Sequence, residues 1–257
     1  MEIVLVGAGR LATNLGKALK ENGHHVRAVF SRTMASAEAL AKQIGASPTD
    51  DLSCLPLQAD AFVVAVKDAV LADVVSVLCR GRENQVFLHT AGSMPMSVFQ
   101  GHAHRYGVFY PMQSFSKERQ VDFSNIPVFI EGCDEQVTAL ARTLAESISQ
   151  KVYELSTADR RHLHLAAVFA CNFANHCYAL SAKVLEKHGL PFDVMLPLID
   201  ETAQKAHVMH PVEAQTGPAI RWDENVMNAQ KALLADEPEM QQIYDLMSKS
   251  IHKLAND

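Results

Sequence analysis

The 257-residue chain lacks basic runs, Cys-x-x-Cys pairs and long apolar segments, and each absence excludes a class of protein. Lysine and arginine number 23 against 29 acidic residues, a net charge of -6, which argues against a nucleic-acid surface. Five cysteines, an odd number, indicate neither a disulfide framework nor a thiolate metal site, as in a reducing cytoplasm. No signal peptide or membrane-length apolar segment is recognised, so we expect a cytoplasmic protein that does not bind membranes.

Histidine is common, with 12 residues, but its spacing does not predict a metal centre. His102 and His104 form one close pair, and His207 and His210 form another. Neither pair has an evident third ligand converging on it, so surface or capping roles are the simpler interpretation. We therefore expect no metal.

The N-terminal residues follow the order of elements that binds a dinucleotide. Residues 3–6 (IVLV) suit a buried parallel strand, and a Gly-x-Gly turn then leads into an amphipathic helix. Gly7 permits the tight turn, Gly9 lets a pyrophosphate approach the backbone, and free N–H groups at the helix start hold the anion. A glycine turn in another kind of α/β protein is the alternative. The predicted phosphate-binding residues are Gly7, Ala8, Gly9, Arg10, Leu11 and Ala12.

The end of the second strand, residues 26–30, indicates which dinucleotide is bound. NAD-binding proteins usually place a carboxylate there to hold the ribose 2′-hydroxyl. This chain has Ser31, Arg32 and Thr33 instead, and a guanidinium between two hydroxyl groups suits a 2′-phosphate. Alternatively, Arg32 is a solvated residue at the start of the next helix. The pattern favours NADP(H) as the cofactor.

Strands and helices continue to alternate, which predicts a doubly wound, Rossmann-like sheet. Further strands are expected at residues 61–66, 86–89, 106–110, 127–130 and 152–155, and the fourth of these contains a proline that favours a sheet edge. A helix is expected at residues 134–147. Ligands of such sheets bind beyond the carboxyl ends of the strands. Val66, Lys67, Thr90 and Gly92 are therefore predicted to border the cofactor.

From Ser156 onward the pattern is helical only, which predicts a nucleotide-binding domain at residues 1–155 and an all-α domain at residues 156–257. Ser156 and Asp159 resemble a capping box, and no proline follows until Pro191. A helix of about 30 residues would be about 45 Å long. This length suggests packing across a homodimer formed through the C-terminal helices.

This long helix carries polar residues within the largely apolar stretch HLHLAAVFACNFANHCYAL, residues 162–180, which is expected to be buried. At about 100° per residue, His164, Cys171, Asn175 and Tyr178 fall on one side, with Asn172 about 80° from His164. Buried polar groups need partners, because an unpaired amide or imidazole is costly. The stripe therefore either pairs with neighbouring helices or lines a cleft.

Two further motifs, GVFYPMQSFS at residues 107–116 and QTGPAIRWDEN at residues 215–225, complete a resemblance that covers nearly the whole chain. With the glycine turn and HLAAVFACN, they resemble a bacterial family of two-domain proteins. These have a Rossmann-like N-terminal domain and a C-terminal helical domain of unknown function, and are described as NADP oxidoreductases. Their layout is similar to that of pyrroline-5-carboxylate reductase and, more distantly, ketopantoate reductase.

The resemblance implies functional positions and shows three departures from the family pattern. Tyr110 stands where the family often has His, Trp222 replaces a Gly, and Gln230 stands at a later position where relatives often carry His. A missing imidazole at either place would weaken the case for catalysis. The matching positions are Pro111, Gln113, Ser114 and Phe115 in the first motif, His164, Ala166, Ala167 and Asn172 in the helix, and Thr216, Gly217, Pro218, Arg221 and Asp223 in the last.

We therefore expect an oxidoreductase that reduces a small imine or carbonyl compound, and the candidate catalytic residues follow from its chemistry. His164 is the candidate acid, because an imidazole transfers protons near neutral pH. Asn172 could orient the acceptor, and Gln113 and Ser114 could hold the substrate or the nicotinamide carboxamide. Arg221 could bind a substrate carboxylate or pair with Asp223 to shape its loop. Alternatives are an NADP(H)-binding regulator or scaffold without catalysis, and a structural dimerisation protein without cofactor affinity.

Overall fold

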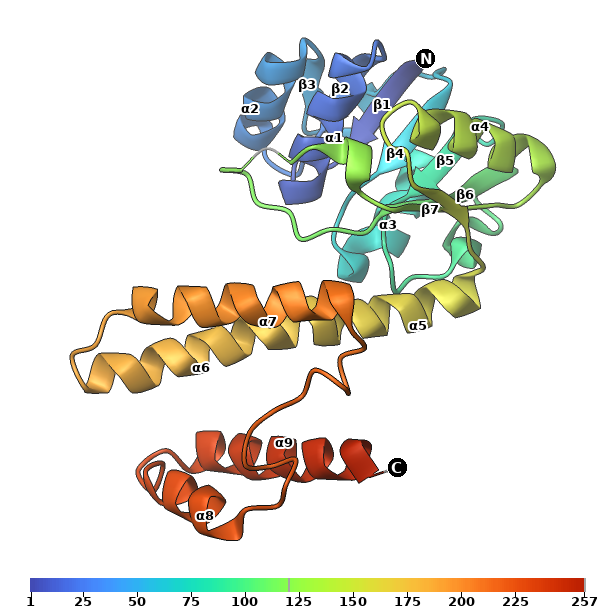
Figure 1. The fold of residues 1–257 in the computed structure, drawn as a ribbon. Helices are drawn as coiled ribbons and strands as arrows, with labels where there is room; N and C mark the ends of the chain where they lie inside the picture. Colours follow the sequence, from blue (N-terminus) through green and yellow to red (C-terminus); the bar gives the residue numbers. More distant parts are fainter. Residues whose placement is uncertain (120, 257) are drawn as a thin grey trace. The chain divides into compact units, whose positions relative to one another are not determined.

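The computed structural model describes residues 1–119 and 121–256, which divide into two compact units (Figure 1). The first unit is Met1–Cys171 and the second is Asn172–Asp257. The proposed domain boundary between residues 155 and 156, inferred from the change in sequence pattern, stays a prediction.

The described part of the first unit is built on an eight-stranded sheet with the strand order β3-β2-β1-β4-β5-β6-β7-β8. Neighbouring strands are parallel except β6 and β7, which pair antiparallel. The chain passes from β1 to one side of the sheet and returns to the other side at β4, so these two strands form the topological switch point. The strands are β1 (Glu2–Val6), β2 (His25–Phe30), β3 (Ser47–Thr49), β4 (Ala61–Val64), β5 (Val86–His89), β6 (Arg105–Pro111), β7 (Val128–Gly132) and β8 (Val152–Glu154).

Helices cover both faces of this sheet. Successive side chains of a strand point to opposite faces, and in the central strands the side chains on both faces are apolar. Ile3 and Leu5 pack into the cluster that contains the apolar sides of α1 (Arg10–Glu21), α2 (Met34–Ile44) and α4 (Glu135–Glu146). Val4 and Val6 pack on the opposite face, in the cluster that contains α3 (Asp68–Leu78). The fold class, a Rossmann-like sheet followed by helices, is confirmed.

Two features of the sheet differ from the sequence prediction. The strand after Pro127 lies between β6 and β8 and is not an edge strand. Pro127 precedes β7 and only its carbonyl is used, accepting a bond of 2.9 Å from the Met112 N–H, so the missing proline N–H costs nothing there. The edge strand β3 was not expected, because its three residues, Ser-Pro-Thr, carry no apolar pattern.

The predicted long helix is present but is interrupted. Ser156 caps α5 (Thr157–Ala167), a π-helical segment Val168–Phe173 follows, and α6 (Ala174–Lys187) completes it. Gly189, with a φ of 66°, stops the helix as expected. The remaining helices are α7 (Leu196–Val208), α8 (Glu224–Ala232) and α9 (Pro238–Asn256).

The burial predicted for this helix is wrong for the single chain. Leu165, Phe169 and Phe173 are 55%, 63% and 50% exposed. An apolar sequence indicates that a surface is suited to burial, but it does not say whether the same chain supplies the cover. Within the described residues, no helix is long and apolar enough to cross a membrane.

Candidate active site

The residues expected to hold a cofactor lie at the carboxyl edge of the parallel strands. Val6, at the end of β1, pairs with Phe30 of β2 on one side and Val64 of β4 on the other. Val64 in turn pairs with His89, at the end of β5. The glycine turn and the loops after β2, β4 and β5 therefore leave the sheet at neighbouring points of one edge.

The glycine turn has the geometry expected of a phosphate cradle. Gly7 has a φ of 125°, and a Cβ there would lie 2.2 Å from the Ala65 carbonyl oxygen, so no larger residue fits against the end of β4. A Cβ on Gly9 would meet nothing within 4 Å, so space is open above the first turn of α1. That turn has no side-chain cap and no acidic residue, and its free N–H groups suit an anion.

The loop after β2 presents a free cation. Arg32 lies between β2 and α2, which begins at Met34 after its N-cap residue Thr33. The Arg32 side chain is exposed and, within the described residues, has neither an ion pair nor a hydrogen bond. The Thr33 hydroxyl donates to the Ser36 Oγ at 2.9 Å. No acidic residue occupies the end of β2, so the residues present fit a 2′-phosphate better than a free 2′-hydroxyl.

The loop after β5 lies between the cofactor edge and helix α5. Thr90 is buried, and its hydroxyl donates to the Val64 carbonyl at 3.4 Å. A Cβ on Gly92 would lie 2.5 Å from His164 Nδ1 and 2.8 Å from Tyr110 Cζ. Ser93 donates a short hydrogen bond to Asp68 at the start of α3. Gly92 is thus required because two side chains pack directly on its Cα.

Those two side chains form the central pair of the site. The Tyr110 hydroxyl lies 3.0 Å from His164 Nδ1, and their rings meet edge to face with centroids 6.0 Å apart. Tyr110 is buried near the end of β6, and burial raises the pKa of its hydroxyl, an effect that the charge of Arg160 opposes. His164 on α5 is half-buried. The pair joins two titratable groups in contact at the edge of the site.

A buried ion pair fixes the start of α5 to the sheet. Arg160 is 1% exposed and pairs with Glu131 of β7, and it also donates to the Met94 carbonyl at 2.7 Å. Glu131 also accepts from Thr157, with its Oε1 bonded by the N–H at 2.8 Å and its Oε2 by the hydroxyl at 2.7 Å. Because a buried ion pair requires such additional partners, this network defines the position of α5, one turn before His164.

His89, at the end of β5, is fully buried beside this network. Burial, together with the nearby charge of Arg160, lowers the pKa of its imidazole to about 3. Its Nδ1 accepts from the Ala91 N–H at 3.2 Å, while Nε2 has no hydrogen-bond partner in the described structure. The ring is therefore neutral and shapes the turn that leads to Gly92.

The loop after β6 carries two of the predicted catalytic residues, Gln113 and Ser114. Neither is bonded to His164 among the described residues. Gln113 and Ser114 are exposed, and the Gln113 Oε1 accepts from the N–H of Ser114 at 2.8 Å. The following residues are tied to α1, because buried Asn14 donates to the Ser116 carbonyl at 2.7 Å. Asn14 thus connects this loop with the glycine-turn helix.

Asn172 and Arg221 lie in the second unit, whereas His164 lies in the first. Both are exposed. Asp223 caps α8 by accepting from the Val226 N–H at 3.3 Å, and the possible Arg221–Asp223 ion pair is not formed among the described residues. The stripe predicted for an unbroken α-helix does not hold, because the π segment between His164 and Asn175 changes the number of residues per turn.

Sequence reasoning missed several residues of this site. In the sequence, Tyr110 is visible only as a departure from the family pattern, and no motif marks Arg160, Glu131, His89 or Asn14. Arg160 and Glu131 pair across 29 residues of the chain, and Asn14 bonds to Ser116 across 102, so no local spacing reveals these partners. The signal available was a charged residue, Glu131, inside an otherwise apolar strand. In the described ranges no three His, Cys, Asp or Glu side chains are grouped to hold a metal.

Comparison with known proteins places this architecture in a family. A Rossmann-like domain matches residues 1–110, and a domain of unknown function, DUF2520, matches residues 126–251. A crystal structure from Bacteroides fragilis, named a "putative NADP oxidoreductase", is 51% identical over 98% of both chains, with a TM-score of 0.94. The chain belongs to this Rossmann-like and DUF2520 family. No curated protein matches it.

More distant structures share the fold of this DUF2520 protein. An imine reductase from Myxococcus stipitatus in complex with NADP+ has a TM-score of 0.68 at 15% identity, covering 100% of this chain and 94% of its own. A 1-pyrroline-5-carboxylate reductase from Streptococcus pyogenes has a TM-score of 0.66 at 16% identity over 98% of both chains. At these identities the likeness shows the fold alone.

Proposed function

We propose that this DUF2520 protein is an NADP(H)-dependent oxidoreductase that reduces a small imine or carbonyl compound bearing a carboxylate. The observation that carries this proposal is the Tyr110–His164 pair, 3.0 Å apart and packed on Gly92. It lies in the unit that also carries the glycine turn. The name of the 51% identical Bacteroides fragilis protein supports the same activity and cofactor.

The first unit supplies the groups that a dinucleotide needs. The free N–H groups after Gly9 would bind the pyrophosphate, and Arg32 with Ser31 and Thr33 would bind the 2′-phosphate. Val66, Lys67 and Thr90 follow β4 and β5 at the same edge. When bound, the nicotinamide supplies the hydride. The protein contributes the orientation of the substrate and its proton.

His164 and Tyr110 would handle that proton. A neutral His164 that accepts the Tyr110 hydrogen bond at Nδ1 carries its own proton on Nε2. That nitrogen has no partner among the described residues and is available to a substrate. A protonated His164 would instead donate through Nδ1 to the Tyr110 oxygen. The pair therefore positions a general acid whose tautomer Tyr110 controls.

The carboxylate requirement rests on Arg221 of the second unit. Its guanidinium is exposed and has no ion pair in the part of the chain that the structure describes. A free guanidinium suits bidentate binding of a carboxylate. Asn172, Gln113 and Ser114 remain proposed substrate-orienting residues, as the family motifs suggest.

A non-catalytic NADP(H)-binding regulator or scaffold is the second candidate. The observation in its favour is that Gln113, in the loop after β6, bonds to the N–H of its own neighbour Ser114. Gln113 is therefore not bonded to His164 among the described residues. In addition, Gln230 of α8, at a position where relatives often carry His, accepts from the Tyr244 hydroxyl at 2.7 Å. Such a protein would bind NADPH but would not oxidise it.

We also propose that the protein is a homodimer through its C-terminal helices. The exposed apolar side chains on these helices include Leu196 and Leu198 of α7 and Leu246 of α9, which are 45%, 63% and 70% exposed. Large apolar side chains that stay exposed on several helices favour a protein interface. Its test is given in the Discussion.

The deciding experiment is a fluorescence titration with NADPH and NADH, followed by turnover assays with cyclic imine carboxylates and 2-keto acids. We expect a preference for NADPH that Arg32→Gln lowers by about 10- to 100-fold, the value of a charge-assisted hydrogen bond. Turnover should fall by about 100-fold or more in His164→Ala, with the NADPH affinity unchanged.

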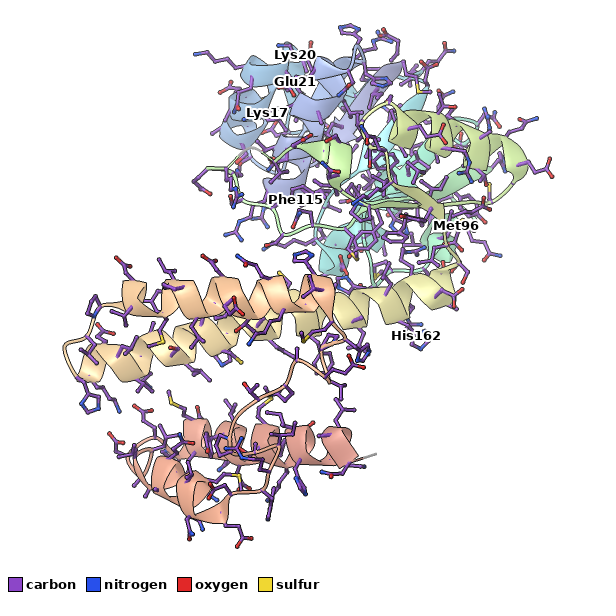
Figure 2. The ribbon with its side chains drawn as sticks, viewed as in Figure 1. Lys17, Lys20, Glu21, Met96, Phe115 and His162 are labelled. Atoms are coloured by element: carbon purple, nitrogen blue, oxygen red, sulfur yellow. The ribbon has the colours of Figure 1, made fainter. Side chains whose placement is uncertain are left out.

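The matched control is His162→Ala on the same helix. His162 is exposed, lies on the opposite side of α5 from the sheet (Figure 2), and its Nδ1 bonds the Ala158 carbonyl of its own turn. This variant should keep both binding and turnover. NADPH binding without turnover in the wild type would favour the regulator, and binding of neither cofactor would reject both candidates.

A further inference from the structure

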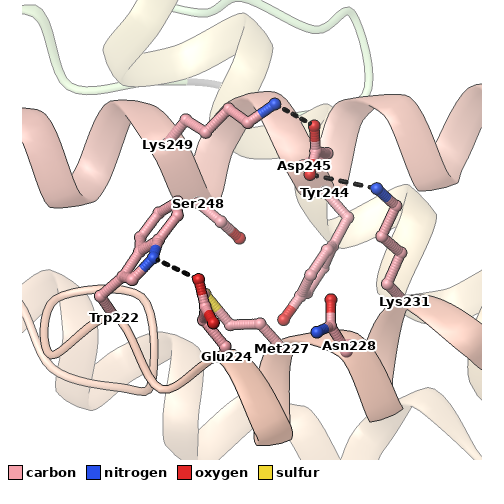
Figure 3. A pocket seen from close by; sticks show the side chains of 9 residues that line it. All are labelled: Trp222, Glu224, Met227, Asn228, Lys231, Tyr244, Asp245, Ser248 and Lys249. Carbon is pink, nitrogen blue, oxygen red and sulfur yellow. Dashed lines mark hydrogen bonds and ion pairs between the residues drawn. The ribbon is translucent and has the colours of Figure 1, made fainter.

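A small cavity lies between α8 and α9 in the second unit, and none of the proposed cofactor-binding or catalytic residues lines it (Figure 3). Its volume is about 180 Å³. Trp222 and Tyr244 present aromatic rings to it, and buried Met227 forms an apolar part of its wall. About 10–15 Å³ of such volume is enough for one water molecule, so the cavity has room for a small metabolite.

Trp222 reaches the cavity from a strained backbone. It is the only non-glycine residue of the described chain with a positive φ, 53°, and it stands where the family pattern has glycine. The left-handed conformation is unfavourable for a bulky side chain. The indole is nevertheless held in place: Nε1 donates to Glu224 at 3.0 Å, and its ring lies 4.8 Å from that of His252. Strain of this kind concentrates at functional sites.

The charged groups of the cavity are divided between two ends. Lys231 and Lys249 share Asp245, with N–O distances of 3.2 and 2.6 Å, which leaves one net positive charge on that side. Those two bonds hold the pKa of Asp245 below its ordinary value, so the carboxylate stays charged. Glu224, at the other end beside Trp222, contributes one net negative charge.

The hydroxyl of Ser248 lies between the two charged ends of the cavity (Figure 3). Ser248 of α9 is 9% exposed, and its Oγ has no hydrogen-bond partner in the described structure. Figure 3 shows this oxygen directed into the cavity between Trp222 and Tyr244. A hydroxyl that faces the cavity and is not bonded by the described residues is available to a ligand.

We propose that this cavity binds a small α-amino acid in its zwitterionic form. The carboxylate is placed at Lys231 and Lys249, and the ammonium at Glu224 beside Trp222, where opposite charges attract. Ser248 donates to the ligand carboxylate. The neutral sum of the four charged residues and their separation into two ends match a dipolar ligand better than a simple anion or cation. The site does not depend on the proposed oxidoreductase activity.

The sequence provides a direct probe, because Trp222 is the only tryptophan of the protein. Selectively excited tryptophan fluorescence of the full chain should change on titration with glycine, L-alanine, L-serine or L-aspartate, and should saturate. Propionate and ethylamine resemble L-alanine without the ammonium and the carboxylate respectively. Each should bind at least tenfold more weakly than L-alanine.

Three variants separate the site from a general effect on folding. Glu224→Gln retains an acceptor for the indole N–H but removes the negative charge, and Lys249→Gln removes one positive charge; each should weaken binding at least tenfold. Lys253→Gln, on the same helix but outside the cavity, should bind as the wild type does. Circular dichroism melting establishes that all three are folded.

The proposal is overturned if none of the four amino acids gives a saturable response at concentrations up to about 10 mM. This highest concentration is about ten times a Kd of 1 mM, so a site with that affinity would be nearly saturated. Equal affinity for propionate and L-alanine would show a simple anion site and would also reject it. Unchanged binding in both charge variants would place the ligand elsewhere. Loss of NADPH binding bears on the proposed cofactor site of the first unit and does not test this cavity.

Discussion

At the scale of single residues, the site depends on a side chain that is missing. Gly92 has no unusual backbone angle, so its conformation could be adopted by any residue. What excludes a larger residue is the approach of His164 and Tyr110, whose atoms would lie 2.5 and 2.8 Å from an added Cβ. Gly92 thus allows the loop after β5 to pack closely against His164 of helix α5 and Tyr110 of strand β6.

Gly92→Ala should therefore separate the Tyr110–His164 pair. Adding one methyl group to a tightly packed place costs about 1–3 kcal/mol, and a displacement of about 1 Å in a catalytic group lowers turnover about 100-fold. Steady-state kinetics and urea unfolding measure the two effects. Gly101→Ala is the control, since a Cβ there meets nothing within 4 Å and only the positive φ is affected. Wild-type turnover in Gly92→Ala would remove the pair from the mechanism.

Residue identity was only partly predictable. His164 stood out because a polar ring in an apolar stretch demands a partner, and the structure supplies Tyr110. The family pattern marks Tyr110 as a departure, because relatives often have His at this position. The structure shows that Tyr110 has a titratable hydroxyl in contact with the imidazole of His164. Arg160 could not be recognised, because its burial depends on Glu131, 29 residues away on another element.

At the scale of elements, the sequence predicts where most strands lie in the chain but not the order in which they pair in the sheet. The buried runs of β1, β4 and β5 are apolar on both faces, and this follows from covering the sheet on both sides. The position of β7 within the sheet depends on strand order, which local pattern does not contain. The π segment was equally hidden, because nothing in VFACNF differs from an ordinary helix.

The turn after β5 gives a prediction about pH. His89 is neutral in the folded protein down to a pH of about 3, whereas in the unfolded chain it takes up a proton near 6.5. Below 6.5 the unfolded state therefore binds more protons, and the free energy of unfolding falls by about 1.4 kcal/mol per pH unit. His89→Asn keeps an acceptor for the Ala91 N–H but does not titrate.

Between pH 7 and 5 the wild type should lose about 2 kcal/mol more stability than His89→Asn, by urea unfolding at each pH. His102→Asn, at an exposed turn position, should follow the wild type. Parallel pH profiles for the wild type and His89→Asn would show that His89 is not the group responsible. Substitution by Asn leaves space behind, so the comparison concerns the slope and not the absolute stability.

At the scale of the whole molecule, the exposed apolar side chains of the C-terminal helices require an explanation that the single chain does not provide. The sequence predicted burial for residues 162–180, and the pattern was a sound guide to the chemistry of the surface. It could not indicate whether another part of the same chain or a second copy covers it.

Light scattering combined with size-exclusion chromatography should therefore show a dimer for the wild type. Leu198 of α7 is 63% exposed, and Leu198→Glu should shift the protein to monomer, because a charge in a buried apolar interface is desolvated without a partner. Gln204→Glu adds the same charge to the same helix at an exposed polar position and should remain dimeric. A monomeric wild type would contradict the dimer itself, while a dimeric Leu198→Glu variant would move its interface away from α7.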